Sequence, residues 1–120
     1  MFHTVVTIVA RAGQREELLR ALRALVNPTR VEPGCLCCRL FQDVEDHDAI
    51  TLIEEWSNGT DLEQRLKSDT YRQLLQLMEL SSIPPQLAFH EVVSTSGVER
   101  VSAARLPDGR CPTDTIAETV

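Results

Sequence analysis

Residues 34–56 of this chain read Gly34-Cys-Leu-Cys-Cys-Arg-Leu-Phe-Gln-Asp-Val-Glu-Asp-His-Asp-Ala-Ile-Thr-Leu-Ile-Glu-Glu-Trp56. Two largely apolar runs, residues 36–44 and 50–56, flank the polar segment Glu45-Asp46-His47-Asp48. Turn-forming residues between two such runs are typical of a β-hairpin. We therefore predict two antiparallel strands here, and the other elements can be placed around them.

One strand and one helix are expected before this hairpin. Residues 2–10 are β-branched and apolar, which predicts a strand. From Gln14 onward, leucines recur at helical spacing and polar residues occupy the other side. This pattern predicts an amphipathic helix, and Asn27-Pro28 is expected to end it.

Two helical segments and one strand are expected after the hairpin. Asn58 is a suitable N-cap for a short helix over residues 58–67, and Ser68 for a second helix. The second helix carries apolar residues at i, i+3, i+4 and i+7, namely Tyr71, Leu74, Leu75 and Met78. Pro84-Pro85 should end it, and residues 86–94 read as the fourth strand.

The expected order is therefore β-α-β-β-α-β, which is the ferredoxin-like arrangement of the α+β class: an antiparallel sheet with helices on one face. Strands one and four carry apolar residues on both faces, so the uncovered face predicts a homodimer whose sheets pack face to face. We assign residues 1–96 to this domain. Residues 97–120 lose periodicity and are expected to be an extended or partly disordered C-terminal extension.

The length of 120 residues predicts a single domain, and the composition is ordinary for a soluble protein. The net charge of −6 argues against a nucleic-acid partner, which would require a basic stripe. No run approaches the ~20 apolar residues of a membrane span, and the first residues lack the pattern of a signal peptide. We therefore expect a cytoplasmic protein with reduced thiols and no membrane partner.

The cysteines of the hairpin, Cys35, Cys37 and Cys38, include a C-x-x-C spacing. On a strand, residues three apart point to opposite faces about 10 Å apart, which exceeds the reach of a disulfide. Cys35 and Cys37 share a face, but at about 7 Å they are also poor partners. We interpret all three as small apolar residues and expect Cys111 in the tail to be the exposed thiol.

Several residues are candidates for chemistry. Trp56 is either a stacking wall for a flat substrate or a core residue. His90 is either a general base or a histidine at an interface or in solvent. Glu54 and Glu55 point to opposite faces, so one could reach a pocket, although pairing with Arg39 is the structural alternative. Tyr71 could donate its hydroxyl group to a ligand or simply pack.

Four stretches give the chain a resemblance to the antibiotic biosynthesis monooxygenase family over about residues 3–95: Glu32-Pro33-Gly34-Cys35-Leu36, Gln42-Asp43, Leu52-Ile53-Glu54-Glu55-Trp56 and Leu66-Lys67-Ser68-Asp69-Thr70-Tyr71. The resemblance implies a dimeric α+β barrel with a pocket between sheet and helices in each subunit. It also implies oxygenation without flavin, haem or metal, because the aromatic substrate supplies the electrons.

The resemblance includes departures at individual positions. Trp56 matches the tryptophan that the oxygenases use, but Leu52 stands where they carry an asparagine. Arg65 and Leu75 stand where haem-degrading relatives need a tryptophan and a histidine, so haem degradation is not expected. Arg65 and Thr70 also replace two histidines that many relatives carry.

We therefore hypothesise a cofactor-independent monooxygenase that acts on a quinol or polycyclic aromatic molecule. His90 or Glu54 would be the catalytic base, and the pocket would be lined by Trp56, Leu52, Tyr71, Phe89 and Met78. The alternative is a non-catalytic binding or stress-response module of the same fold, in which no proton moves. A purely structural dimer would need no pocket.

Overall fold

The structure, a computed structural model, describes residues 1–107 of the chain. The elements follow in the order β1 (Phe2–Val9), α1 (Arg15–Arg30), β2 (Cys35–Gln42), β3 (Ala49–Trp56), α2 (Gly59–Leu66), α3 (Asp69–Met78), β4 (Gln86–Glu91) and α4 (Val98–Arg105). None of the helices within residues 1–107 is long and apolar enough to cross a lipid bilayer.

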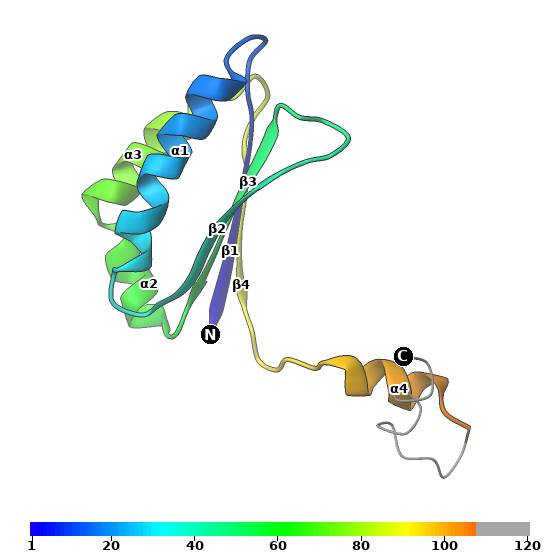
Figure 1. The fold of residues 1–120 in the computed structure, drawn as a ribbon. Helices are drawn as coiled ribbons and strands as arrows, with labels where there is room; N and C mark the ends of the chain where they lie inside the picture. The colour runs from blue at the N-terminus through cyan, green and yellow to red at the C-terminus, as the bar shows by residue number, and fades with distance from the viewer. Residues whose placement is uncertain (108–120) are drawn as a thin grey trace.

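The four strands form one antiparallel sheet in the order β2-β3-β1-β4. Helices α1, α2 and α3 cover one face of this sheet, and no helix within residues 1–107 lies over the other face (Figure 1). The hairpin of β2 and β3 is present as predicted, and the strand order places β1 between β3 and β4. The predicted ferredoxin-like α+β fold is confirmed.

Alternation along the strands decides which residues enter the core. In β1, Thr4, Val6 and Ile8 are buried beneath the helices, while the residues between them are half-exposed. They pair in register with alternate residues of β3, which are buried as well. The helices contribute one apolar stripe each to this core: Leu18, Leu22 and Leu25 from α1, Leu62 from α2, and Leu74 and Met78 from α3.

The two short helices begin where their capping residues predict. The side-chain oxygen of Asn58 accepts a hydrogen bond from the backbone N–H of Asp61 at 2.8 Å. The hydroxyl group of Ser68 accepts one from the N–H of Tyr71 at 3.1 Å. Each cap satisfies an N–H group that the first helical turn leaves without a partner, so the sequence sets both helix starts.

Helix α1 continues past the point where Asn27-Pro28 was expected to end it. Pro28 lies inside the helix, which runs to Arg30. A proline removes one backbone N–H, and in the last turn that loss affects a single hydrogen bond. Two side chains secure the turn: the Thr29 hydroxyl donates to the carbonyl of Leu25 at 2.7 Å, and Arg30 Nε donates to the carbonyl of Cys38 at 3.0 Å.

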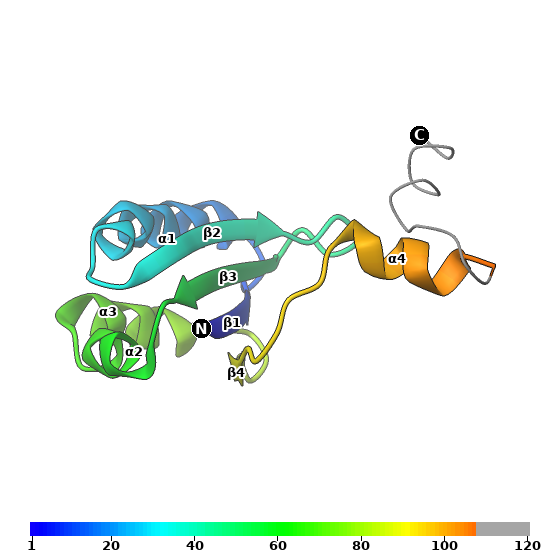
Figure 2. The ribbon, with the colours of Figure 1, turned by 90° about the horizontal axis from the view of Figure 1, so that it is seen from below.

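The segment after the sheet also differs from the sequence expectation. Val98–Arg105 form helix α4, where an extended or partly disordered segment was expected from residue 97. Both views show α4 apart from the sheet and the other helices (Figures 1 and 2). Cys111 and the rest of the predicted tail, residues 108–120, lie outside the described residues. The boundary near residue 96 remains a prediction.

The uncovered sheet face carries a row of apolar residues at its centre. Val5 pairs in register with Ile53 on one side and with Ala88 on the other. Phe41 lies on the same face and is 44% exposed. At one end of the face, the rings of His3 and His90 lie 6.1 Å apart.

Helix α3 offers a matched test of the core. Leu74 is 0% exposed and its neighbour Leu75 is 44% exposed. We expect Leu74→Ala to lower the free energy of unfolding by about 2–5 kcal/mol, because it removes packed atoms and leaves a cavity. Leu75→Ala should cost less than about 1 kcal/mol. Equal losses in urea denaturation would contradict this assignment of the core face.

Candidate functional site

The C-terminal end of β3 presents a buried carboxylate. Glu54 and Trp56 are two residues apart, so both side chains point toward the helices, and each is at most 1% exposed. The indole Nε1 of Trp56 donates to Glu54 Oε1 at 3.0 Å. A carboxylate in this position needs a cation, since burying an unpaired charge is very costly.

Arg65, on α2, supplies that cation. Its Nε donates to Glu54 Oε1 at 3.0 Å and its Nη2 donates to Oε2 at 3.1 Å, which makes a bidentate pair. The Arg65 side chain is fully buried. Its guanidinium carbon lies 5.1 Å from the ring centroid of Tyr71 on α3, within the range of a cation–π contact. The ion pair therefore joins β3, α2 and α3.

A second carboxylate approaches Arg65 from the loop between α1 and β2. Glu32 Oε2 lies 3.7 Å from Arg65 Nη1. Neither atom has a hydrogen-bond partner among residues 1–107, and both are buried. Gly34 lets this loop pack against α2: its φ is +80°, and a Cβ there would lie 2.3 Å from Asp61 Oδ2. Only glycine fits such a position without strain.

Burial changes the proton affinity of this site. Desolvation raises the pKa of Glu32, the charge of Arg65 opposes that rise, and the charge of Glu54 adds to it. Desolvation also raises the pKa of the Tyr71 hydroxyl. The site therefore contains a carboxylate with increased basicity beside a cation that keeps one donor free.

A cavity of about 220 Å³ adjoins these groups. Its wall is formed by Glu32, Pro33, Trp56, Asp61, Gln64, Arg65 and Ser68. The lining combines a buried cation, a carboxylate and the surroundings of the Trp56 side chain, which is itself 0% exposed. Such a site can bind a polar oxygen atom of a small molecule through hydrogen bonds.

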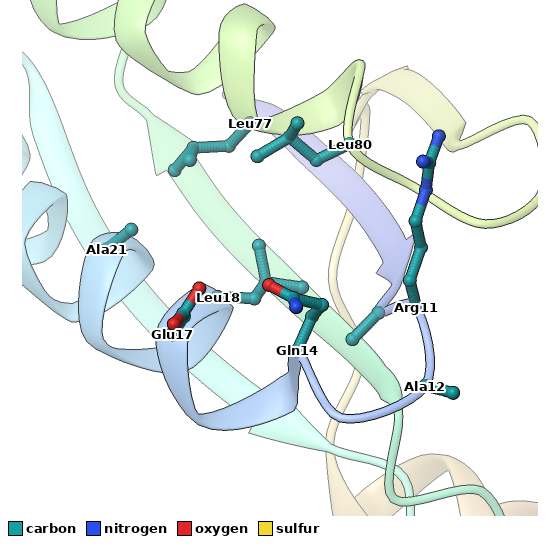
Figure 3. A pocket seen from close by; sticks show the side chains of 9 residues that line it. Arg11, Ala12, Gln14, Glu17, Leu18, Ala21, Leu77 and Leu80 are labelled. Carbon is teal, nitrogen blue, oxygen red and sulfur yellow. The ribbon is translucent and has the colours of Figure 1, made fainter.

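A larger cavity of about 580 Å³ lies between the start of α1 and the end of α3 (Figure 3). Its lining is mainly aliphatic, with Arg11, Gln14 and Glu17 at its edge; the remaining residues are Ala10, Ala12, Leu18, Ala21, Leu77 and Leu80. None of the site residues predicted from the sequence lines this cavity. Because Phe2 pairs with Trp56 while Ala10 follows the other end of β1, the two cavities lie at opposite ends of the sheet.

The structure brings together three of the predicted site residues: Trp56, Glu54 and Tyr71 surround Arg65. Leu52 and Met78 are buried in the core cluster.

The other two lie elsewhere. Phe89, on the edge strand β4, is 44% exposed and pairs with Thr4. His90 points to the uncovered sheet face beside His3, so it lies on the opposite face from Glu54.

Two residues of this cluster, Arg65 and Glu32, were not predicted as site residues. Arg65 had been noted only as the residue that stands where relatives carry a tryptophan or a histidine. Its position offered a signal, because it follows Leu62 by three residues and so lies on the apolar face of α2. An arginine there must find a buried partner. Glu32 gave no comparable signal, since it lies in a loop.

Of the hairpin cysteines, Cys38 is buried, whereas Cys35 and Cys37 are half-buried, and none forms a disulfide within residues 1–107. Burial raises the pKa of Cys38 to about 12. Burial also raises the pKa of Cys35. Across residues 1–107, no three His, Cys, Asp or Glu side chains are grouped so that they could hold a metal ion.

Comparisons with known proteins agree with this architecture. The sequence model described as antibiotic biosynthesis monooxygenase matches residues 1–77. Among curated proteins, the chain is 19% identical over 89 residues to the protein sll1783 of Synechocystis, which gives 73% coverage of this chain and 60% of sll1783. The chain therefore spans about 60% of the length of that relative.

Three solved structures match the chain at a higher sequence identity than sll1783 does. PA3566 from Pseudomonas aeruginosa is 30% identical, with a TM-score of 0.68, 78% of this chain covered and 94% of that one. A Deinococcus radiodurans protein named after the same monooxygenase family is 20% identical, with a TM-score of 0.74 and coverages of 82% and 98%. Rv0793 from Mycobacterium tuberculosis is 22% identical, with a TM-score of 0.71 and coverages of 80% and 98%. The last two likenesses concern the fold alone.

The buried ion pair can be tested by a double-mutant cycle. We expect Arg65→Met to lower the free energy of unfolding by about 3–5 kcal/mol, because Glu54 would remain charged and unpaired. Combining Arg65→Met with Glu54→Gln should restore much of the loss, since the amide oxygen still accepts from Trp56. Arg72→Ala, which breaks an exposed pair with Asp69, should change stability by less than about 1 kcal/mol. A double variant as unstable as Arg65→Met would contradict the pairing.

Proposed function

Because the chain belongs to the antibiotic biosynthesis monooxygenase family, we propose that it is a monooxygenase that acts on a quinol or polycyclic aromatic molecule and uses no flavin, haem or metal. One observation carries this proposal: a cavity adjoins Trp56 and the buried Arg65, whose Nη1 atom has no hydrogen-bond partner within the described residues. A quinol in this cavity would place an oxygen substituent near that donor.

The reaction balances without a cofactor. For a hydroquinone, the substrate and one molecule of dioxygen give a hydroxyquinone and one molecule of water. One oxygen atom enters the ring and the other leaves as water, and the electrons come from the substrate. Deprotonation of the quinol comes first, so the protein must accept a proton and stabilise the resulting anion.

The two bases predicted from the sequence are not equivalent. Both oxygen atoms of Glu54 already accept hydrogen bonds from Arg65, and one also accepts from Trp56. We therefore propose that Glu54 positions Arg65 rather than taking the proton itself. His90 stays a prediction; as a base it would need a substrate on the other face of the sheet. Within the substrate pocket, roles for Leu52, Tyr71, Phe89 and Met78 likewise stay predictions.

We further propose a homodimer that forms through the uncovered sheet face, in a dimeric α+β barrel. The central row of Val5, Ile53 and Ala88 supports this, because an apolar sheet face is stabilised when a second copy covers it. The three free cysteines of the hairpin support a reducing compartment, and we propose the cytoplasm.

The dimer can be tested by placing a charge in this row. We expect Ile53→Lys to shift the protein from dimer to monomer in sedimentation equilibrium, because the buried lysine would lie unpaired between the sheets. Val44→Lys, in the exposed hairpin turn, should leave the dimer intact. A wild-type protein that sediments as a monomer would contradict the proposal.

The alternative is a non-catalytic module that binds a small hydrophobic molecule. The cavity of about 580 Å³ favours it, because its aliphatic lining and size suit a drug-sized apolar ligand. Binding there would require no proton transfer.

Oxygen uptake tests the catalytic proposal. With metal-free protein and a panel of hydroquinones and anthrones, we expect uptake above the spontaneous rate. Trp56→Leu should lower kcat/KM by up to about tenfold through loss of the indole hydrogen bond to Glu54. His90→Ala measures whether His90 is the base: an unchanged rate removes it from that role, and a reduced rate assigns it.

The same assay separates the two functions. If no substrate is oxidised, while an apolar fluorescent probe binds to wild type and not to Ala21→Trp, the binding module replaces the enzyme. Ala21 lines the larger cavity, so a tryptophan there should fill it.

A further inference from the structure

The three nitrogen atoms of the Arg65 guanidinium have different surroundings. Nε and Nη2 both donate to Glu54, so their geometry fixes the plane of the group. Nη1 is then held on the side of Glu32, 3.7 Å from its Oε2. The two atoms form an ion pair at this distance, but each of them is buried and lacks a hydrogen-bond partner among residues 1–107. Buried polar atoms are ordinarily hydrogen-bonded, so the arrangement requires an explanation.

The distance between the two atoms suits a single shared oxygen atom. Hydrogen bonds of about 2.8 Å to each atom can meet at one point, because 3.7 Å is shorter than their sum. That oxygen must accept from Nη1 and donate to the Glu32 carboxylate. A hydroxyl group does both, whereas a carbonyl only accepts and an ammonium only donates.

We propose that Glu32 and Arg65 bind the hydroxyl group of a single-ring phenol or quinol, and that Glu32 is the catalytic base that removes its proton. The substrate O–H bond breaks, a bond forms between the proton and Glu32 Oε2, and the electron pair stays on the substrate oxygen. Arg65 Nη1 donates a hydrogen bond to the oxyanion. This role rests on the proposed oxygenase function, but the binding of the hydroxyl group does not.

The cavity limits the size of the ring. A cavity of about 150 Å³ holds a benzene molecule. The cavity beside Glu32 and Arg65 has about 220 Å³. It therefore has room for one substituted ring, and we take single-ring quinols as the substrate class.

The groups around Glu32 favour its role as the catalytic base. Arg65 and Asp61 approach from α2, Glu54 from β3, and the thiol of Cys35 from β2. Burial raises the pKa of Glu32 above that of a free glutamate, which makes it a stronger base. The base must be ionised, so turnover should fall as the pH drops through this raised pKa, at a pH above the ordinary value of 4.5.

The first experiment uses 4-nitrophenol, a single-ring phenol whose neutral and ionised forms have different visible spectra. It measures the dissociation constant and the form of the bound ligand, without oxygen turnover. Wild type should bind the neutral form at least tenfold more tightly than the phenolate, because the ionised Glu32 accepts from the hydroxyl group and repels the anion.

Glu32→Gln should reverse this preference, because Arg65 would then favour the anion and nothing would repel it. Glu32→Asp should keep the preference for the neutral form. Glu63→Gln is the matched control, since Glu63 is an exposed glutamate of α2 that does not line the cavity, and it should behave as wild type. A role of Glu32 in folding alone would not reverse the preference.

Three outcomes would overturn the proposal: no binding of 4-nitrophenol to wild type, the same preference in Glu32→Gln and wild type, or equal kcat/KM for quinol oxidation by the two proteins. We expect Glu32→Gln to lower kcat/KM by about 100-fold or more. If no quinol is oxidised but Glu32→Gln still reverses the 4-nitrophenol preference, the oxygenase function fails and the hydroxyl site stands.

Discussion

The rest of the structure depends on the bidentate pair between Glu54 and Arg65. Both side chains are fully or almost fully buried, so neither can remain charged without the other. The pair joins β3 to α2, and Tyr71 on α3 packs against the same guanidinium. A loop, two helices and a strand meet at this point because Glu32 completes the cluster from the α1–β2 loop. Removing either partner alone would leave a buried charge unpaired, although apolar residues of similar size often replace both partners without loss. The position of the pair beside a cavity makes it part of the candidate functional site.

The pair with Glu54 also explains why the Nη1 atom of Arg65 makes no hydrogen bond within the described residues. A carboxylate accepts in parallel from only two of the three guanidinium nitrogens, so the third is directed elsewhere by a rigid plane. Here it faces a second carboxylate that is too far away for a hydrogen bond and close enough to share a ligand atom. A histidine at this position could not pair with Glu54 in this bidentate way and also present a donor to Glu32. Arg65 does both.

The sheet divides the molecule into two regions with different requirements. The helix-covered face holds the core, the ion pair and both cavities discussed above. The opposite face carries a row of apolar residues and the adjacent His3 and His90. Strand alternation sends every second residue to each face. The two predicted bases, Glu54 on β3 and His90 on β4, are separated by β1 and lie on opposite faces, so they cannot serve one pocket. This geometry separates Glu54 from His90 more decisively than any property of the two side chains.

The sequence by itself determined the order of elements, the hairpin of residues 34–56, the helix starts at Asn58 and Ser68, and the ferredoxin-like fold, because these follow from local periodicity and capping. It also singled out Trp56 and Glu54 as candidate site residues, which the structure places side by side. The sequence pattern placed the end of α1 at Pro28, whereas hydrogen bonds from the Thr29 and Arg30 side chains secure its last turn. The pattern also did not predict α4. Only the tertiary structure decided that Arg65 and Glu32, 33 positions apart in the numbering, would meet beside Trp56. Their meeting depends on a loop that packs against α2 through Gly34, and no local pattern specifies a contact over that distance.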